Sequence, residues 1–155
     1  SDKGISTSRD VSTGNTATAI GADNLFDMVY ALKGQYLGRP GTRWLFHRLA
    51  LKMIRKLQDN NKQYLWQPGL TQGQPDTILG IGVINSEHVP CTFTTGQYVG
   101  MLGDFSFYWI VDALDAAIQV LDQLYAESNQ TGYIIRAESD AMPVLEEAFV
   151  RSKLA

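Results

Sequence analysis

The chain has 155 residues, of which 45% are hydrophobic and 19% are charged, and its formal net charge is −3. That length fits one domain with a substantial core, and the weakly acidic balance disfavours a dedicated nucleic-acid binder because phosphate binding relies on clustered Lys and Arg. No apolar run approaches the roughly 20 residues that span a bilayer, and the single Cys91 has no disulfide partner in the chain, which favours a reducing compartment.

The start of the chain predicts an arm followed by a helix. Residues 1–21 are mainly Ser, Thr and Gly, so burial does not offset the entropy of ordering them and we expect a flexible linker or arm. A helix is expected over Ala22–Leu37, where Gly38 and Pro40 supply the stop signal. Its predicted apolar face consists of Leu25, Val29, Leu32 and Tyr36.

A short strand and a second helix come next. Thr42–His47 suits a buried strand, and Arg48–Leu57 suits a helix. The predicted apolar face of this helix is Leu49, Met53 and Leu57, with Ala50 and Ile54 beside them. The opposite face carries Arg48, Lys52, Arg55 and Lys56. These four cations form either a basic patch for phosphate or, as is more common, a solvated face.

The middle of the chain combines short strands with a polar loop. Gln63–Trp66 is expected to be a strand, and Gln67–Asp76 a surface loop because it holds two Gly and two Pro. Thr77–Ile84 is a further apolar strand, broken by Gly80 and Gly82, where we expect another group to approach the backbone closely. Strands that alternate with helices indicate a mixed α/β layer.

The stretch Thr95–Asn129 holds the densest apolar run, and we expect the rest of the chain to be organised around it. Within it, a turn at Gly103–Phe105 leads into Phe107–Val111, an aromatic strand predicted to be covered on both faces. Ala116–Tyr125 fits either a helix, which propensity favours, or a strand. Two segments follow: a strand at Gly132–Ala137, and a strand or helix at Val144–Val150.

Metal ligands are few in this sequence. His88 and Cys91 have the spacing of two ligands, but a structural zinc site needs four, and His47 is the only other histidine. The Gly80-Ile81-Gly82 step lacks the third glycine of a dinucleotide fingerprint. The sequence therefore predicts no metal and no cofactor.

Catalytic groups are not predicted either. Asp104, Asp112 and Asp115 are expected at turns, where Asp caps the backbone, and not as a general acid and base. A loop ion cluster is expected from Arg136, Glu138 and Asp140. The residues indicate a protein that works through a surface and not through a reaction.

Several stretches, taken in order along the chain, carry a family resemblance. They are Trp44–His47, Ile54–Asp59, Tyr64–Pro68, Gly73–Gly80, Val89-Pro90, Gly103–Ser106 with Tyr108–Asp112, Arg136, and Glu147–Phe149. In sequence and spacing the set resembles the major capsid protein of tailed bacteriophages, which has the Hong Kong 97-type fold. The chain departs from the family pattern at Gly80–Val83, Asp112-Ala113 and Asp140-Ala141.

The resemblance implies an α+β (mixed α/β) fold over residues 22–155: the axial domain of a capsid subunit with the returning strands of the peripheral domain. It implies that the chain is the C-terminal portion of a longer subunit, without the amino-terminal arm, extended loop and spine helix, and that Ala116–Tyr125 is a strand. The loop that meets its copies at the capsomer axis would be Gln67, Pro68, Gly69, Leu70, Thr71, Gln72, Gly73, Gln74, Pro75 and Asp76.

The resemblance also implies a structural function without catalysis. Copies of the subunit would assemble in the bacterial host cytoplasm into the icosahedral capsid of a virion, which encloses DNA without sequence-specific binding and involves no membrane. This portion alone would be monomeric. The nearest alternative is an encapsulin-like nanocompartment shell of related fold. A small-molecule-binding or hydrolytic α/β domain is a second alternative, and nucleic-acid contact through the basic helix face is a third.

Overall fold

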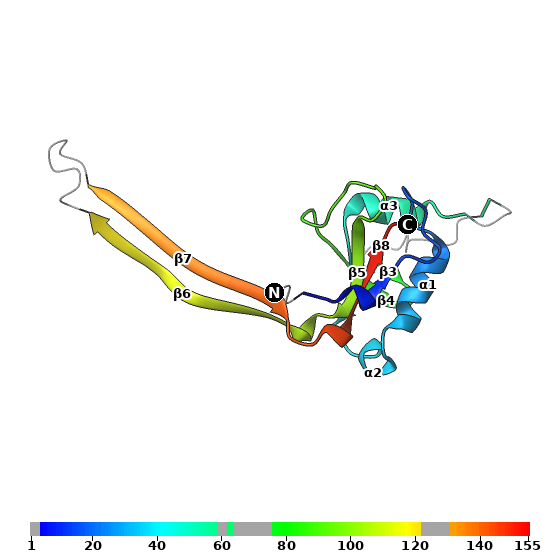
Figure 1. The fold of residues 1–155 in the computed structure, drawn as a ribbon, viewed down its shortest axis with the longest axis horizontal. Coiled ribbons are helices and arrows are strands. Elements are labelled where there is room, and N and C mark those ends of the chain that lie inside the picture. The colour runs from blue at the N-terminus through cyan, green and yellow to red at the C-terminus, as the bar shows by residue number, and fades with distance from the viewer. Residues whose placement is uncertain (1–3, 59–61, 64–75, 122–130) are drawn as a thin grey trace. The chain divides into compact units, whose positions relative to one another are not determined.

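The computed structural model describes residues 4–58, 62–63, 76–121 and 131–155. The chain divides into two units, Ser1–Phe107 with Leu145–Ala155, and Tyr108–Val144. The first unit holds a six-stranded sheet with its helices, and the second is a two-stranded hairpin (Figure 1). None of the helices among the described residues has the length and apolar character that crossing a membrane requires.

The sheet of the first unit has the strand order β1-β8-β5-β2-β4-β3. The strands are β1 (Asp10–Val11), β2 (Thr42–Phe46), β3 (Thr77–Ile78), β4 (Ile81–Asn85), β5 (Tyr98–Asp104) and β8 (Phe149–Lys153). β5 is antiparallel to both β2 and β8, whereas β1 is parallel to β8 and β2 is parallel to β4. Helices on a mixed sheet confirm the α+β class expected from the sequence. β5 itself was not predicted, and it includes Gly103, where we expected a turn to begin.

Among its described residues the first unit has three α-helices, α1 (Ala22–Ala31), α2 (Gly34–Leu37) and α3 (Arg48–Arg55). The single helix expected over Ala22–Leu37 is wrong, because Leu32 has an extended backbone (φ −75°, ψ 132°) and its N–H ends α1 on the Met28 carbonyl. Gly34, a weak helix former, follows this break. The buried members of the predicted apolar face are Leu25, Leu32 and Tyr36.

α3 follows β2 in the chain and precedes β3 and β4, and its buried side chains belong to the hydrophobic core of the sheet unit. It begins after His47, whose Nδ1 accepts a hydrogen bond from the Leu49 N–H at 3.1 Å. Its buried side chains are Ala50, Leu51 and Ile54. The buried side of α3 is therefore rotated about the helix axis relative to the predicted apolar face, because Leu49, a member of the predicted face, is 40% exposed. The docking of α3 on the sheet decides which side is buried, and eight residues of periodicity do not define that direction.

One face of the sheet forms the core. The register aligns Trp44, Leu102 and Val150 across β2, β5 and β8, and each is 0% exposed. Phe46 and Gly100 form the pair two positions away from Trp44 and Leu102, and they therefore lie on the same face of the sheet. A Cβ added at Gly100 would come within 2.2 Å of the Phe46 ring, so the ring occupies the space of the missing side chain. The glycine is required by this packing.

Residues 4–21 are part of the sheet unit, which differs from the flexible linker or arm predicted there. Their strand β1 pairs with β8, and Ile20 is 2% exposed. Asn15 Nδ2 donates hydrogen bonds to Ser152 Oγ at 3.2 Å and to the Lys153 carbonyl oxygen at 2.9 Å. Polar side chains, through specific hydrogen bonds, thus fix a segment whose low apolar content indicated disorder.

β3 and β4 form a tight hairpin within the predicted strand Thr77–Ile84. Leu79 and Gly80 make the turn with φ of 51° and 78°, so the break expected at Gly80 is confirmed. Gly82 does not break the strand but lies inside β4, where an added Cβ would come within 2.6 Å of Arg43 Nη1. The close approach expected at glycine is therefore found at Gly82.

The second unit consists of two antiparallel strands, β6 (Tyr108–Leu121) and β7 (Gly132–Pro143). Ala116–Tyr125, for which both helix and strand were left open, is a strand as far as Leu121. The remaining four residues lie outside the described residues. β7 confirms the strand predicted at Gly132–Ala137 and extends it to Pro143.

The aromatic stretch at the start of β6 is exposed, so the expected coverage on both faces is wrong. Trp109, Ile110 and Val111 are 59%, 70% and 57% exposed. Phe107 belongs to the 3-10 turn Phe105–Phe107 and not to the strand. An apolar run without polar alternation is typical of a buried strand, but among the described residues no further strand joins this ribbon.

The last predicted segments have mixed outcomes. Val144–Val150 contains the 3-10 turn Glu146–Ala148 and the first two residues of β8. The predicted strand Gln63–Trp66 lies outside the described residues beyond Gln63. The predicted loop Gln67–Asp76 also lies outside them, apart from Asp76.

Candidate interaction surfaces

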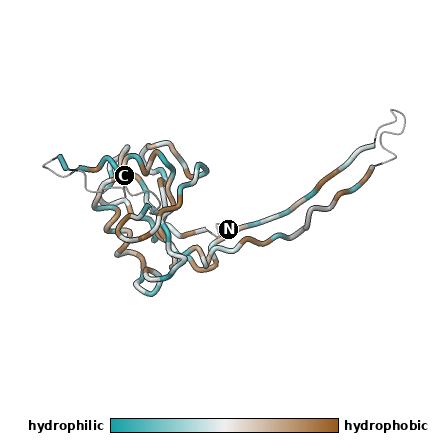
Figure 2. Tube along the Cα trace, turned by 180° about the vertical axis from the view of Figure 1, so that it is seen from behind, coloured by the Kyte–Doolittle hydropathy of each residue, from teal (hydrophilic) through white to brown (hydrophobic). Residues whose placement is uncertain are grey.

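One face of the β6–β7 hairpin gathers four exposed apolar side chains. The register pairs Ile118 with Ile135 and Val120 with Tyr133, and the two pairs are two positions apart, so all four share a face. Their exposed fractions are 65%, 65%, 49% and 66%. Figure 2 shows hydrophobic stretches along both strands. We call these four residues the hairpin apolar face; a contiguous apolar surface of this kind marks an interaction site.

The edges of the hairpin point to the same conclusion. β6 has 14 residues and β7 has 12, and among the described residues each pairs only with the other. A two-stranded hairpin is marginally stable in water by itself, and long unpaired strand edges readily accept another chain. The hairpin therefore has the properties of a segment that packs against a partner.

A second surface lies on α3, where basic side chains surround an open hollow of about 500 Å³. The hollow is lined by Arg48, Leu51, Lys52, Arg55, Lys56, Asp76 and Asn85. Two of the cations are neutralised, since Arg48 Nε lies 3.4 Å from Glu87 Oε1 and Arg55 pairs with Asp76. We call Arg48, Lys52, Arg55 and Lys56 the α3 basic surface.

Lys52 and Lys56 differ from the two arginines of this surface. Both lysines are exposed, and no carboxylate among the described residues lies within ion-pair distance of either. Asp76, which pairs with Arg55, is the only residue of the predicted capsomer-axis loop that the structure describes.

Asp104 is fully buried and has a structural role. Its Oδ1 accepts a hydrogen bond from the Ser106 N–H at 3.0 Å, and its Oδ2 lies 3.3 Å from Arg39 Nε. The turn-capping role expected from the sequence is confirmed. The Arg39 guanidinium also lies 5.1 Å from the centre of the Phe107 ring, so it stabilises the turn that leaves β5.

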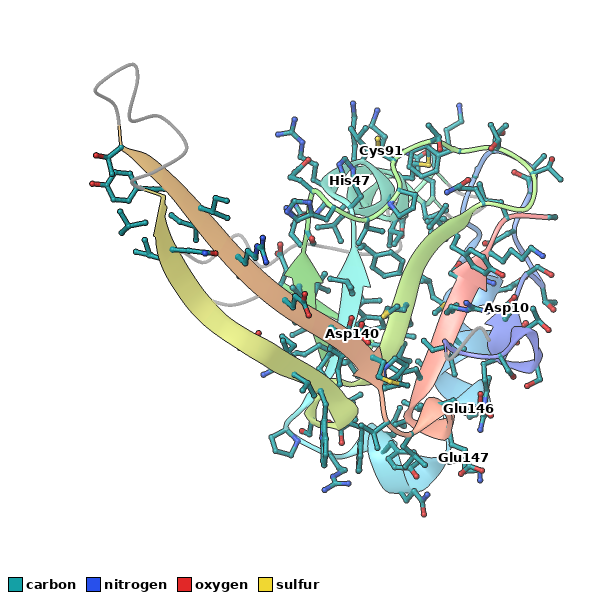
Figure 3. The ribbon with its side chains drawn as sticks, turned by 60° about the vertical axis from the view of Figure 1, so that its left-hand side comes forward. Asp10, His47, Cys91, Asp140, Glu146 and Glu147 are labelled. Atoms are coloured by element: carbon teal, nitrogen blue, oxygen red, sulfur yellow. The ribbon has the colours of Figure 1, made fainter. Side chains whose placement is uncertain are left out.

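The other predicted carboxylates lie in strands. Asp112 and Asp115 belong to β6 and not to turns, so the turn setting expected for them is wrong. Asp140, shown in Figure 3, belongs to β7, and its Oδ1 accepts a hydrogen bond from the Ala141 N–H at 2.8 Å. The loop ion cluster expected from Arg136, Glu138 and Asp140 is therefore wrong as to its setting, because all three lie on this strand.

The histidines and the cysteine have separate environments. Cys91 is an exposed free thiol, and the His88 N–H donates a hydrogen bond to Ser86 Oγ at 3.3 Å. His47 is buried, and its Nε2 lies 2.8 Å from Glu87 Oε2. Within the described residues, no group of three or more His, Cys, Asp or Glu side chains is arranged to hold a metal ion.

Polar contacts that the sequence did not predict anchor the sheet edge, and Figure 3 labels Asp10, the residue that makes two of them. Arg151 Nη2 lies 2.6 Å from Asp10 Oδ1, and the Tyr98 hydroxyl donates to Asp10 Oδ2 at 2.9 Å. This hydrogen bond, with burial, raises the pKa of Tyr98 above its ordinary 10.0. Lys33 lies 2.5 Å from Glu147 and lowers the pKa of that carboxyl below 4.5. Partners 141 positions apart, as Asp10 and Arg151 are, leave no periodic signal in a sequence.

Comparison with known proteins identifies the family to which the chain is similar. A family model described as the phage capsid family matches residues 2–154. No curated protein matches the chain. The family match covers nearly the whole sequence, including the two units described above.

Three solved structures share the fold. The capsid of an empty GTA particle is 23% identical with a TM-score of 0.74, and the match covers 94% of this chain and 49% of that chain. The capsid of a native GTA particle is 25% identical with a TM-score of 0.68, covering 94% and 54%. A structure of Gordonia phage Cozz is 19% identical with a TM-score of 0.64, covering 94% and 49%. The chain thus spans about half the length of these proteins, and the likeness confirms the capsid fold.

Proposed function

This chain belongs to the phage capsid family, and on that premise we propose that it is the part of a major capsid subunit that supplies the sheet unit and the β6–β7 hairpin to a viral shell. It is a structural protein, and it acts by association with copies of its own subunit and without catalysis. Identical subunits that repeat the same heterologous contacts close into rings, and rings join into an icosahedral shell. The comparisons do not favour a nanocompartment shell or a ligand-binding α/β domain.

The hairpin apolar face carries this proposal. Ile118, Val120, Tyr133 and Ile135 expose large apolar areas on a ribbon that is marginal alone, which suits burial against a neighbouring part of the shell. Each buried apolar side chain of this size contributes about 1.5–3 kcal/mol. Many such modest contacts add through multivalency, so no single interface needs to be strong.

We also propose a role for the loop Gln67–Asp76, as the segment that meets its copies at the capsomer axis. Its polar composition with two Gly and two Pro supports a surface position. Asp76, its last residue, forms an ion pair with Arg55 of α3.

We further propose what the shell contains and where it assembles. The shell encloses DNA without reading its sequence, which suits a subunit portion with a net charge of −3. Assembly takes place in the bacterial host cytoplasm. The 155-residue chain alone is monomeric, because it spans about half the length of the similar capsid proteins and therefore offers fewer contacts between copies.

Expression of the gene that encodes this chain, followed by a search for assembled shells, tests the proposal. Substitution of Ile118→Lys together with Ile135→Lys is expected to abolish sedimenting shells while soluble subunit persists, because two charges enter the buried contact. The matched control, Gln119→Lys with Ser139→Lys, adds the same charge at exposed polar positions and is expected to assemble. Equal shell yields from both variants in gradient sedimentation and electron microscopy would contradict the role of this face.

Two further readouts separate the alternatives. Particles that hold DNA support the phage shell, whereas particles that hold a packaged enzyme support a nanocompartment. For the chain alone, light scattering after size-exclusion chromatography is expected to give the mass of one copy, 17.2 kDa. Closed shells formed by the chain alone would refute the monomer.

A further inference from the structure

We propose that the α3 basic surface contacts the phosphate backbone of double-stranded DNA, weakly and without regard to base sequence. The inference rests on the proposed function, since DNA is the content of the shell, and it assigns the contact with that DNA to named residues of this chain. The surface consists of Arg48, Lys52, Arg55 and Lys56 around the hollow beside α3.

The spacing of the cations suits a phosphate backbone. Arg48 and Lys52 in α3 and Lys56 at its C-cap are four residues apart in succession, so they follow one line at intervals of about 6 Å. Phosphates of one DNA strand repeat at about 3.4 Å along the duplex axis, so this line is long enough for roughly three of them. Arg48 is 70% exposed, and both lysines are exposed, so a duplex has access to all three.

The local charge is positive although the chain is acidic. Among the described residues, Glu87 and Asp76 each pair with one arginine of the surface, so its four cations exceed these two carboxylates by two. Both ion pairs are partly solvent-exposed and therefore contribute little, which allows a phosphate to exchange for a carboxylate. Asn85 lines the same hollow, and its side-chain amide is an uncharged hydrogen-bond donor for a phosphate oxygen.

A weak contact of this kind is sufficient in a shell. An excess of two charges predicts low affinity for one copy, and the net charge of −3 opposes wider contact with DNA. A shell presents many copies of the subunit to one molecule of DNA, so the weak contacts add by multivalency although no single site binds DNA tightly. An acidic protein segment would meet the same cations, and the experiment below includes it as an outcome.

Binding of a fluorescent duplex to the 155-residue chain, followed by anisotropy over a salt series, tests the inference. The observed constant is expected to fall with salt with a logarithmic slope of about −2 to −3. Substitution of Lys52→Gln with Lys56→Gln keeps helix propensity and is expected to weaken binding at least roughly 10-fold at about 50 mM salt and to reduce the slope by about 2. The matched control is Arg9→Gln with Arg136→Gln, which removes two charges elsewhere and is expected to retain most of the binding.

Several outcomes would overturn the inference: absence of salt-dependent binding, equal loss in the control, or tighter binding of polyglutamate than of duplex. Circular dichroism of each variant verifies that the fold is intact, so loss of binding is not confused with unfolding. Shell formation by the Lys52→Gln, Lys56→Gln subunit is expected to persist. Failure of DNA binding with intact shells would refute this inference alone, whereas failure of shells from the unaltered subunit would refute the proposed function.

Discussion

Ser152 Oγ donates a hydrogen bond to Asn24 Oδ1 at 2.7 Å, across 128 positions of sequence, and both side chains are fully buried. Asn24 Nδ2 in turn donates to the carbonyl oxygens of Val11 and Thr13 at 3.1 and 3.0 Å. One amide therefore joins β8, α1 and the beginning of the chain, and it holds β1 at the sheet edge.

Replacement of Asn24 by Ala is expected to lower the free energy of unfolding by about 1–3 kcal/mol, because it leaves buried groups on Ser152, Val11 and Thr13 without a partner. Urea denaturation measures the change. The control Tyr30→Ala, at a site 86% exposed on the same helix, is expected to stay within about 0.5 kcal/mol. Equal effects of the two changes would refute the role of the amide.

Gly100 is expected to tolerate no side chain. In Gly100→Ala the new Cβ meets the Phe46 ring at 2.2 Å and the Leu45 carbonyl oxygen at 2.9 Å, so thermal unfolding is expected to report a loss of about 1–3 kcal/mol. Gly34→Ala provides the contrast, because nothing lies within 4 Å of its added Cβ and helix propensity rises by about 0.5–1 kcal/mol. A neutral Gly100→Ala would mean that the ring and the strand are not packed as described.

Tyr98 predicts an alkaline loss of stability. Its pKa is raised above 10.0 by the hydrogen bond to Asp10 and by burial, so the folded state holds its proton more tightly than the unfolded state. The stabilisation is complete below pH 10.0 and is lost as the pH rises through the folded pKa. Tyr98→Phe is expected to remove this pH dependence, as measured by denaturation at a series of alkaline pH values. An unchanged alkaline slope in the variant would contradict the assignment.

Glu147 predicts a smaller effect in acid. The hydrogen bond and charge of Lys33 lower the pKa of Glu147 below 4.5, so the stabilisation is present above pH 4.5 and is lost as the pH falls through the folded pKa. Carboxyl titration by NMR is expected to show the low pKa, and Lys33→Met is expected to return it toward its ordinary value. Lys52→Met, which removes a lysine outside this contact, serves as the control.

The register of the hairpin predicts a selective disulfide. With Cys91 replaced by Ser, Ile118→Cys and Ile135→Cys face each other across β6 and β7 and are expected to cross-link under mild oxidation. The pair Ile118→Cys and Ile134→Cys places the thiols on opposite faces and is expected to remain reduced. Mass spectrometry distinguishes the two states, and cross-linking of the second pair alone would reveal a register shifted by one residue.

The sequence by itself determined the local elements and the family. The run Thr42–His47 predicted a strand, Arg48–Leu57 predicted a helix, and Gly80 predicted a break, because neighbouring residues encode propensity and turn chemistry. The ordered motifs around Trp44, Gly103 and Glu147 indicated the capsid family, which the family match confirms.

Tertiary structure alone decided which surfaces are covered. Phe107–Val111 has the composition of a buried strand, yet Trp109 and Ile110 are exposed, because burial depends on what lies across a strand and not on the strand itself. Conversely, residues 4–21 have few large apolar side chains but are held by Asn15 and Asn24 through partners more than a hundred positions away. Long-range hydrogen bonds of this kind are specified by three-dimensional register, which local sequence patterns do not carry.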